Sequence, residues 1–384
     1  MAKKKPEGYL SAKESRRISR ENRKITNEFE KKRKRKNVPE EEYITTMKDE
    51  GNVLEIDNLH TYFFTDAGTV KSVNGVSFEV PVGKTVGVVG ESGCGKSVTS
   101  LSIMQLVQRP QGQTVDGEIR LNMGDGKAYN VVNTPNYMMQ SIRGNYVSMI
   151  FQEPMTSLNP VFRIGDQIDE VIALHNPEMS KEDVRKKTLE MIELVGIANS
   201  EGVARMYPHE LSGGMRQRIC IAIGLACNPR LIIADEPTTA LDVTIQAQIL
   251  DLLRELKDKI NSSIMLITHD LGVIAEMADY VVVMYAGRVV EKGTATDIFK
   301  NPCHPYTIGL MNSKPVVGKK VDRLYSIPGK VPNPIDMPDY CFFKDRCEMC
   351  VEGCNGAYPE MVKLSDTHYV SCYRHYENTQ KEGK

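Results

Sequence analysis

The stretch KTVGVVGESGCGKSVTSLSIMQL, residues 84–106, decides the fold of this chain. Its apolar run at residues 86–89 is typical of a buried strand, and the pattern after Lys96 is typical of a helix. Between them, residues 90–97 read GESGCGKS and match the pattern G-x-x-x-x-G-K-[ST] in full. A strand before this motif and a helix after it are the context in which it forms a phosphate-binding loop. The stretch therefore predicts an α/β fold that binds a nucleotide.

The residue types of this loop fit phosphate chemistry. Glycines let backbone N–H groups turn inward around phosphate oxygens, and the start of the following helix adds its positive dipole end. Lys96 would reach the β- and γ-phosphates, and Ser97 would ligate Mg²⁺. Cys94 occupies a variable position of the motif and is interpreted as a small filler. The candidate nucleotide-binding residues of the loop are Gly90, Glu91, Ser92, Gly93, Cys94, Gly95, Lys96 and Ser97.

Two further apolar runs end in polar side chains. LIIADEP, residues 231–237, predicts a buried parallel strand that ends in Asp235 and Glu236. Asp235 would lie on the Mg²⁺ side, and Glu236 would be the base that polarises the attacking water. SIMLITHD, residues 263–270, ends in the same way, so we expect His269 to contact the γ-phosphate or to orient Glu236.

A second helix-start anion site lies in LSGGMRQR, residues 211–218. A single ATP molecule has no obvious use for both this site and the phosphate-binding loop of the same chain. The economical prediction is a dimer, in which this segment of one subunit closes over the γ-phosphate bound by the loop of the other.

The motifs above, together with MIFQEPMTSLNP (residues 149–160) and TTALDVT (residues 238–244), resemble the ATP-binding-cassette ATPases in identity and in order. The resemblance covers about residues 53–300. It implies that Gln152 is the Q-loop glutamine, which senses Mg²⁺ and water, and that Asp242 is the D-loop aspartate at the dimer interface. Phe63 resembles the aromatic residue that stacks on adenine, and Tyr62 is the alternative for that role.

The same resemblance implies a fold and further site residues. The fold is a P-loop NTPase with a RecA-like core, an antiparallel β subdomain and a helical subdomain at about residues 153–213, which receives a transmembrane partner. An ATPase active in hydrolysis is expected, because the catalytic positions match the family pattern. The signature residues implied to contact the nucleotide of the partner subunit are Ser212, Gly213, Gly214 and Gln217.

Composition bounds the remaining possibilities. The chain has 384 residues, 41% of them hydrophobic, and a formal net charge of −1. Residues 1–36 nevertheless hold fifteen Lys/Arg against five Glu, so residues 1–50 are predicted to be a separate basic extension, either a charged helix or a disordered arm. No secretory leader and no apolar run of membrane-spanning length is visible, which favours a cytosolic protein.

The last part of the chain narrows the family. NPCHPYTIGLMNSKP (residues 301–315) and SIPGKVPNPIDMPDYCFFKDRC (residues 326–347) resemble the C-terminal region of the oligopeptide/dipeptide (peptide/nickel) importer ATPases of the OppD/DppD type. The resemblance implies an ATPase subunit that drives peptide uptake from the cytoplasmic face of the cell membrane. The implied partners are a second ATPase subunit in a heterodimer, two permeases and an extracellular solute-binding protein, with no nucleic acid.

Residues 301–384 also contain a cysteine cluster. Four cysteines at spacing C-x5-C-x6-C-x17-C leave four thiols for one centre in a loop-rich segment. Thiolate ligation suits Zn²⁺ or a [4Fe–4S] cluster, a zinc knuckle could use Cys350, and free thiols remain an alternative. The importer resemblance favours the iron–sulfur cluster. Its candidate ligands are Cys341, Cys347, Cys354 and Cys372.

Two alternatives for function remain. ATPases of the same importer type also serve nickel or other small solutes, and the sequence does not choose the substrate. Cassette ATPases without membrane partners act on nucleic acid or ribosomes, and the basic extension could serve such a role. The single P-loop and the importer-type C-terminus favour transport. The cysteine region is expected to affect catalysis only indirectly, because it contributes no phosphate-binding motif.

Overall fold

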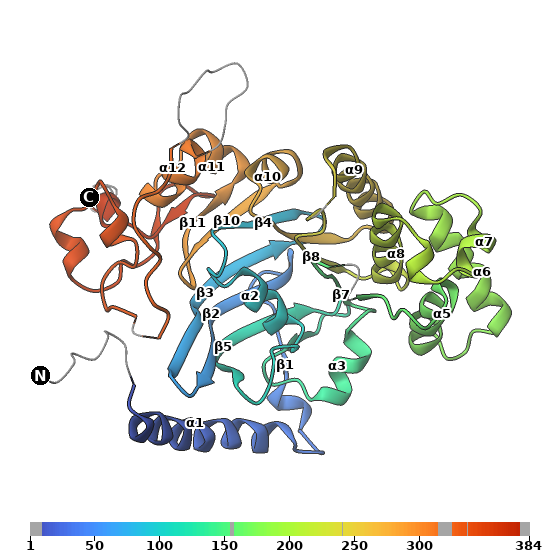
Figure 1. The fold of residues 1–384 in the computed structure, drawn as a ribbon, viewed down its shortest axis with the longest axis horizontal. Helices are drawn as coiled ribbons and strands as arrows, with labels where there is room; N and C mark the ends of the chain where they lie inside the picture. Colours follow the sequence, from blue (N-terminus) through green and yellow to red (C-terminus); the bar gives the residue numbers. More distant parts are fainter. Residues whose placement is uncertain (1–9, 154–156, 240, 314–324, 336, 377–384) are drawn as a thin grey trace, which may run out of the picture.

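The computed structural model describes residues 10–153, 157–239, 241–313, 325–335 and 337–376 (Figure 1). Residues 1–9 of the predicted basic extension and residues 154–156, just after Gln152, lie outside the described residues. Two sheets and the helices around them build the predicted α/β P-loop fold, with an antiparallel sheet and a helical part. Among the described helices, none is both long and apolar enough to cross a membrane.

The smaller sheet is antiparallel and has the order β1-β6-β5-β2-β3. Its body is a long hairpin of β2 (Asn52–Thr65) and β3 (Gly68–Pro81), against which β5 (Gly112–Asn122) pairs. The short strands β1 (Ile44–Thr45) and β6 (Ala128–Asn130) complete it.

The larger sheet has the order β12-β13-β11-β10-β4-β9-β8-β7. Strands β10, β4, β9, β8 and β7 are parallel, and β11, β13 and β12 extend the sheet in antiparallel fashion. Its strands are β4 (Thr85–Val89), β7 (Val147–Ile150), β8 (Leu231–Asp235), β9 (Ser263–Ile267), β10 (Tyr280–Tyr285), β11 (Arg288–Thr294), β12 (Val362–Lys363) and β13 (Tyr369–Val370).

Both faces of the parallel strands are covered, which explains why these strands are apolar throughout. In β8, Leu231 and Ile233 face a core shared with the antiparallel sheet, whereas Ile232 and Ala234 face a core shared with helices. Because successive side chains of a strand point to opposite faces, the apolar residues of β8 contribute alternately to two cores.

Helices begin at Lys96 and at Gly213, where the sequence patterns predict helix starts. In Figure 1, α5, α6 and α7 gather at one end of the molecule, and residues 337–376 lie at the opposite end. The helices after α1 are α2 (Lys96–Ile103), α3 (Asn136–Ile142), α5 (Ile164–His175), α6 (Lys181–Leu194), α7 (Ser200–Ala204), α8 (Gly213–Leu225), α9 (Val243–Ile260), α10 (Leu271–Met277), α11 (Ala295–Lys300) and α12 (Pro305–Asn312).

Part of the basic N-terminal segment is a docked helix, α1 (Ala12–Arg33). Ser11 and Glu14 close a capping box at its start, and basic residues fill its last turn, both of which stabilise a helix. Asn22 is buried and donates a hydrogen bond of 2.8 Å to the carbonyl of Thr65, at the end of β2. The helix lies along the antiparallel sheet rather than extending into solvent (Figure 1).

The C-terminal segment shares the core of the ATPase fold. Strand β13 pairs with β11, so this segment adds an edge to the main sheet. The ring of Phe343 lies 5.2 Å from that of Tyr285 in β10 and 5.5 Å from that of Tyr306 in α12. A segment with little apolar material of its own is therefore anchored on the core of the preceding residues.

Candidate functional site

The predicted phosphate-binding loop joins the carboxyl end of β4 to the start of α2. Gly95 has a φ of 102° and is the N-cap of α2. A Cβ atom at this position would lie 2.4 Å from the carbonyl oxygen of Ser72, so both its conformation and its surroundings require glycine. Lys96 is 6% exposed, and its Nζ donates to the carbonyl oxygens of Gly90 at 2.8 Å and Glu91 at 3.1 Å. The lysine is thus folded back along the loop.

Of the three residues predicted at the Mg²⁺ site, Ser97 and Asp235 are in contact, whereas Gln152 contacts Glu236. Ser97 Oγ donates to Asp235 Oδ1 at 3.1 Å, which links the start of α2 to the end of β8. Burial raises the pKa of Asp235, and the neighbouring Glu236 adds to this shift, whereas the Ser97 hydrogen bond and Lys96 oppose it. A cation between the hydroxyl and the carboxylate would relieve the cost of burying that charge. Oxygen donors of these types are the ligands that Mg²⁺ prefers.

Glu236 is the centre of a hydrogen-bond network. Its Oε2 accepts from Gln152 Nε2 at 3.1 Å and from Thr239 Oγ1 at 2.9 Å. Its Oε1 lies 3.2 Å from His269 Nδ1. Gln152, Glu236 and His269 follow β7, β8 and β9, whose carboxyl ends meet at one edge of the parallel sheet. The structure therefore brings the three predicted catalytic residues together.

Glu236 also has an unusual backbone. Its φ is 47°, in the left-handed region of backbone conformation that residues other than Gly, Asn and Asp rarely adopt. Its N–H is held by the carbonyl of Ile267 at 2.8 Å. Strained backbone of this kind occurs where the surrounding structure aims a side chain, as it does here toward Gln152 and His269.

The signature residues occupy a different part of the molecule. Ser212 is the exposed N-cap of α8, and its Oγ accepts from the N–H of Met215 at 3.3 Å. In Figure 1, α8 lies on the helical side of β8 and α2 on the other side. Asp242 is likewise an exposed N-cap, of α9. Gly213 and Gly214 follow Ser212 in the first turn of α8, and a Cβ at Gly213 would meet no atom within 4 Å.

One predicted signature residue does not share this exposure. Gln217 is 1% exposed, and its Nε2 has no hydrogen-bond partner among the described residues. Along the first turn of α8, Gly213 is exposed and Gly214 is half-buried, so exposure of the signature segment falls toward Gln217. Contact between Gln217 and a nucleotide on a partner subunit stays a prediction.

The two candidate aromatic residues differ in their surroundings. Tyr62 donates from its hydroxyl to Asn74 at 2.8 Å and lies 3.0 Å from His60 Nδ1. Phe63 follows it on the opposite face of β2, because successive side chains in a strand alternate. Phe63 is half-buried and packs beside Gly112 of β5. The hydroxyl of Tyr62 is already engaged within the hairpin, which leaves Phe63 the better candidate for stacking on a base.

The four predicted ligand cysteines converge. Cys341, Cys354 and Cys372 are buried and Cys347 is half-buried, although they are spread over 32 residues of sequence. Each of the four thiols interacts electrostatically with the other three. Burial raises the pKa of Cys341 to about 12, and none of the nine cysteines forms a disulfide. Such buried thiols stay protonated unless a cation lowers their pKa.

The spacing of these thiols bears on which group they fit. Four thiolates around one Zn²⁺, each at about 2.3 Å, bring their sulfur atoms to roughly 3.8 Å from one another. Among the described residues, one group of three metal-binding side chains has all its ligand atoms within 4.8 Å of one another. That group contains none of these four cysteines. No three of the four sulfur atoms therefore lie within 4.8 Å of one another, although all four thiols interact electrostatically. Cys350 is exposed, but it forms a side-chain hydrogen bond with Cys354 and interacts electrostatically with Cys347.

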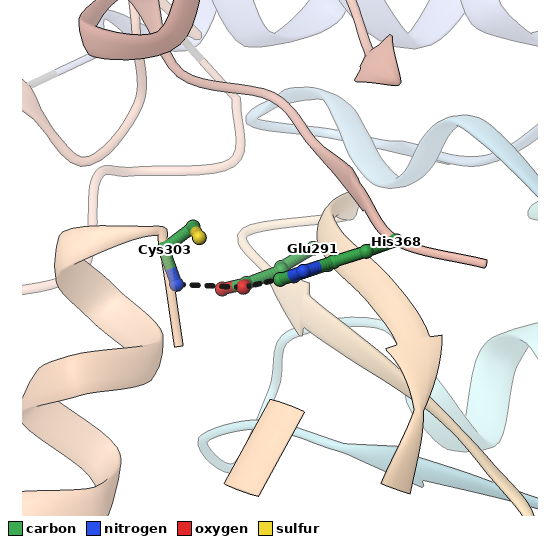
Figure 2. A group of neighbouring side chains, drawn as sticks. All are labelled: Glu291, Cys303 and His368. Carbon is green, nitrogen blue, oxygen red and sulfur yellow. Dashed lines mark hydrogen bonds and ion pairs between the residues drawn. The ribbon is translucent and has the colours of Figure 1, made fainter. Parts of the chain in front are cut away.

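The compact group is Glu291, Cys303 and His368 (Figure 2). Glu291 is fully buried, and its carboxylate accepts from the N–H of Cys303 at 2.7 Å, the N–H of His304 at 2.9 Å and Nε2 of His368 at 2.8 Å. Burial, with a contribution from Glu291, raises the pKa of Cys303 to about 11. Both carboxylate oxygens of Glu291 accept hydrogen bonds, and the thiol of Cys303 is protonated. We therefore interpret this group as a hydrogen-bond network that links β11 to the start of α12 and to the residue before β13.

The sequence interpretation missed Arg346. This residue ends a short 3-10 turn, Lys344–Arg346, and its side chain is 6% exposed. Its guanidinium donates to Glu91 Oε2 at 2.9 Å and to Glu91 Oε1 at 3.0 Å, so the cysteine region contacts the phosphate-binding loop itself. The signal in the sequence is weak: a cation beside Phe342 and Phe343, which are aromatic residues typical of a core.

Comparisons with known proteins agree with this geometry. The family described as ABC transporter matches residues 73–239, and it implies ATP and Mg²⁺ as cofactors. The family described as oligopeptide/dipeptide transporter, C-terminal region, matches residues 290–354. A dimeric structure of the ATP-binding cassette MJ0796, in a post-hydrolysis state with ADP and Pi, is 25% identical with a TM-score of 0.55. That match covers 63% of this chain and 98% of the cassette.

Curated relatives are similar over most of their length. The oligopeptide transport ATP-binding protein AppD of Bacillus subtilis is 50% identical over 325 residues, which cover 85% of this chain and 97% of AppD. The dipeptide transport ATP-binding protein DppD of Bacillus subtilis is 48% identical over 321 residues, which cover 84% and 94%. With a complete set of ATPase motifs and this C-terminal region, the chain belongs to the oligopeptide/dipeptide family of ABC transporter ATP-binding proteins.

Proposed function

We propose that this chain is the ATP-hydrolysing subunit of an importer for oligopeptides or dipeptides. It would lie at the cytoplasmic face of the cell membrane and pair with a second, related ATPase subunit below two permeases, which receive solute from an extracellular binding protein. The observation that carries the proposal is the C-terminal region, which matches that of oligopeptide/dipeptide transporters and is built into the ATPase fold through β13.

The catalytic roles follow from the contacts around Glu236. As general base, Glu236 takes a proton from the water that attacks the γ-phosphate, while the bond from that phosphorus to the leaving oxygen of ADP breaks. Gln152 and His269 hold its carboxylate from two sides and orient it. Ser97 and Asp235 would hold Mg²⁺, which neutralises phosphate charge. Lys96 would turn from the loop carbonyls toward the phosphates.

A dimer completes the site. The N-terminus of α8 offers the exposed Ser212 and Gly213, and a helix N-terminus of this kind suits the γ-phosphate of a nucleotide bound by another subunit. Asp242, exposed at the start of α9, would lie at the same interface. Phe63 would stack on the adenine of the nucleotide bound by its own chain. The printed description of MJ0796 as a dimer is in keeping with this arrangement.

Purification from native membranes tests the transport assignment. A tagged chain should copurify with two permeases and a second ATPase. In proteoliposomes with the binding protein, di- and oligopeptides should stimulate ATP hydrolysis and enter the vesicles. Stimulation by Ni²⁺ and not by peptides would favour the nickel alternative. Copurification with ribosomes or nucleic acid, without permeases, would overturn transport.

We also propose that Cys341, Cys347, Cys354 and Cys372 hold a [4Fe–4S] cluster. The support is the mutual electrostatic interaction of the four thiols and their burial within one loop-rich segment. Such a cluster would supply folding energy to a loop-rich segment.

Metal analysis of anaerobically purified protein tests the cluster. About four irons per chain and a broad absorption band near ~400 nm are expected. Cys354→Ser should lose the iron, whereas Cys350→Ser, the matched control at an exposed thiol, should keep it. One zinc per chain that is lost in Cys350→Ser would replace the cluster with a zinc knuckle. Protein with neither metal would leave ordinary thiols.

A further inference from the structure

The cysteine region reaches the phosphate-binding loop through one buried side chain. Arg346 and Glu91 lie 255 positions apart in the sequence and form a two-pronged ion pair with distances of 2.9 and 3.0 Å. The arginine side chain is 6% exposed and the glutamate side chain 28% exposed. A planar guanidinium that binds both oxygens of a carboxylate restrains its orientation as well as its distance.

The arginine is itself fixed. Its Nε donates to the carbonyl of Pro328 at 2.8 Å, and Nη1 donates to the hydroxyl of Tyr285 at 3.3 Å. Burial disfavours the charge of Arg346, but its hydrogen bonds to Glu91 and Tyr285 outweigh that effect and raise the pKa of the guanidinium. The charged head therefore occupies one position, held from the C-terminal segment on one side and from β10 on the other.

Glu91 is held at its backbone as well. Its N–H donates to the hydroxyl of Tyr306 at 2.8 Å, and its carbonyl accepts from Lys96 Nζ at 3.1 Å. Tyr306 is fully buried, and its ring centroid lies 4.7 Å from that of Tyr285. Residues beyond the nucleotide motifs thus restrain both the main chain and the side chain of one loop residue.

The charge of Glu91 gives this contact a consequence for ATP. A carboxylate on the loop that receives a triphosphate repels it, unless a cation neutralises that carboxylate. Among the described residues, Arg346 is the cation that forms an ion pair with Glu91. Removal of the arginine would leave a partly buried negative charge beside the phosphate site, and charges in such surroundings are weakly screened.

We propose that Arg346 is a positioning residue for ATP binding, which acts through Glu91 by neutralising its carboxylate and holding the phosphate-binding loop in shape. The C-terminal region is then part of the nucleotide site's support and not only an appendage of the transporter. Because Arg346 would act through Glu91 and not on the reacting atoms, its removal should weaken ATP binding more than it slows hydrolysis of bound ATP.

A set of charge variants tests the proposal in the full-length chain. Equilibrium binding of Mg-ATP is measured for Arg346→Met, Glu91→Gln and the double variant. Arg346→Met should raise the dissociation constant about tenfold, a size typical of coupled contacts. The double variant should bind within about threefold of wild type, since it leaves no unpaired carboxylate. In the assembled transporter, Arg346→Met should raise KM and change kcat less.

Two controls keep the result interpretable. Lys344→Met removes a cation from the same turn that lies over Tyr340 and should leave ATP binding unchanged. Arg346→Lys keeps the positive charge but not the two parallel hydrogen bonds to Glu91, so it should weaken ATP binding less than Arg346→Met. This variant also tests the proposal if Arg346→Met does not fold. Equal losses in Arg346→Met and in the double variant would overturn the neutralising role. Unchanged ATP affinity in a folded Arg346→Met would overturn the proposal altogether.

Discussion

At the scale of single residues, Glu236 has the geometry of a positioned base. Its carboxylate has partners on both oxygens, and its backbone is held in a left-handed conformation. Thr239 adds a contact that the sequence did not single out. The side chain is therefore oriented before ATP arrives, and its oxygens are held where a water could give up a proton.

Replacing this carboxylate should separate binding from hydrolysis. Glu236→Gln keeps the shape and the contact to Thr239 but removes the base, so hydrolysis should fall on the order of 10²-fold or more while ATP still binds. ATPase rates of the assembled transporter and nucleotide binding are the measurements. Glu276→Gln, on the exposed side of α10, is the control. Near-normal turnover in Glu236→Gln would remove Glu236 from the mechanism.

His304 predicts a pH dependence of the C-terminal region. Its Nδ1 accepts from the N–H of Tyr306 at 3.0 Å as the N-cap of α12. Burial lowers the pKa of His304 to about 4; Glu291 opposes this shift and His375 adds to it. Because the unfolded histidine titrates near 6.5, this group's contribution to stability is complete above that pH. It is lost progressively as the pH falls toward 4.

The measurement is the free energy of unfolding between pH 7.5 and pH 4.5. His304→Asn keeps a cap that can accept the same hydrogen bond but does not titrate, so its stability should fall less over this range. The low pKa of Glu291 contributes a loss only below its ordinary value of 4.5. Parallel curves for wild type and variant would show that protonation of His304 does not limit stability.

At the scale of elements, the start of α8 has a local role and a proposed intermolecular one. Ser212 caps its own helix and also presents its hydroxyl to solvent. Local capping explains why a serine stands there, since it accepts an orphan N–H. It does not explain why the exposed Gly213 and the half-buried Gly214 follow, because glycine favours a helix less than other residues except proline. Close approach of another subunit accounts for both.

Ser212→Arg separates these roles when compared with Ser180→Arg. Ser180 is the exposed N-cap of α6 and accepts from Asp183 in the same way. Both variants lose a cap, worth about 1 kcal/mol, but Ser212→Arg alone should block closure over a partner's nucleotide. ATP binding should persist in both, and hydrolysis should fail in Ser212→Arg only. Full hydrolysis by a strictly monomeric chain would contradict the dimer.

At the scale of the whole molecule, the C-terminal region connects two sites. Arg346 pairs with Glu91 in the phosphate-binding loop, and Cys347 follows it directly. The same segment packs Phe343 against Tyr285 and Tyr306. We therefore expect a change of order in the cysteine group to affect the nucleotide site, because Cys347 is adjacent to Arg346.

This connection predicts that loss of a cysteine ligand weakens ATP binding. Cys347→Ser should lose iron and raise the dissociation constant of Mg-ATP, because the turn that carries Arg346 is then less restrained. Cys350→Ser, at an exposed thiol, should change neither quantity. Iron content and nucleotide binding are measured on the same anaerobic sample. Loss of iron with unchanged ATP affinity would mean that the turn is held by its aromatic neighbours alone.

The predicted fold is confirmed, and the network around Glu236 was largely visible in the sequence. The glycine loop, the two strand ends and the signature each depend on residues within one short stretch, and parallel strands bring their carboxyl ends together by topology. Gln217 shows the limit of this reasoning. Its motif placed it beside Gly213 and Gly214, and helical periodicity puts positions 213 and 217 on the same side of α8. That Gln217 is nevertheless 1% exposed is decided by the packing of α8 in the folded core.

By itself, the sequence determined the nucleotide-binding class of this protein, because each motif carries its chemistry within about eight neighbouring residues. Only the tertiary structure decided that α1 docks on β2 through Asn22, that four distant thiols converge, and that Arg346 holds Glu91. The physical reason is that the sequence around a side chain is the same whether that side chain contacts solvent or a residue 255 positions away. The partner is chosen by packing of the whole core, which no local pattern encodes.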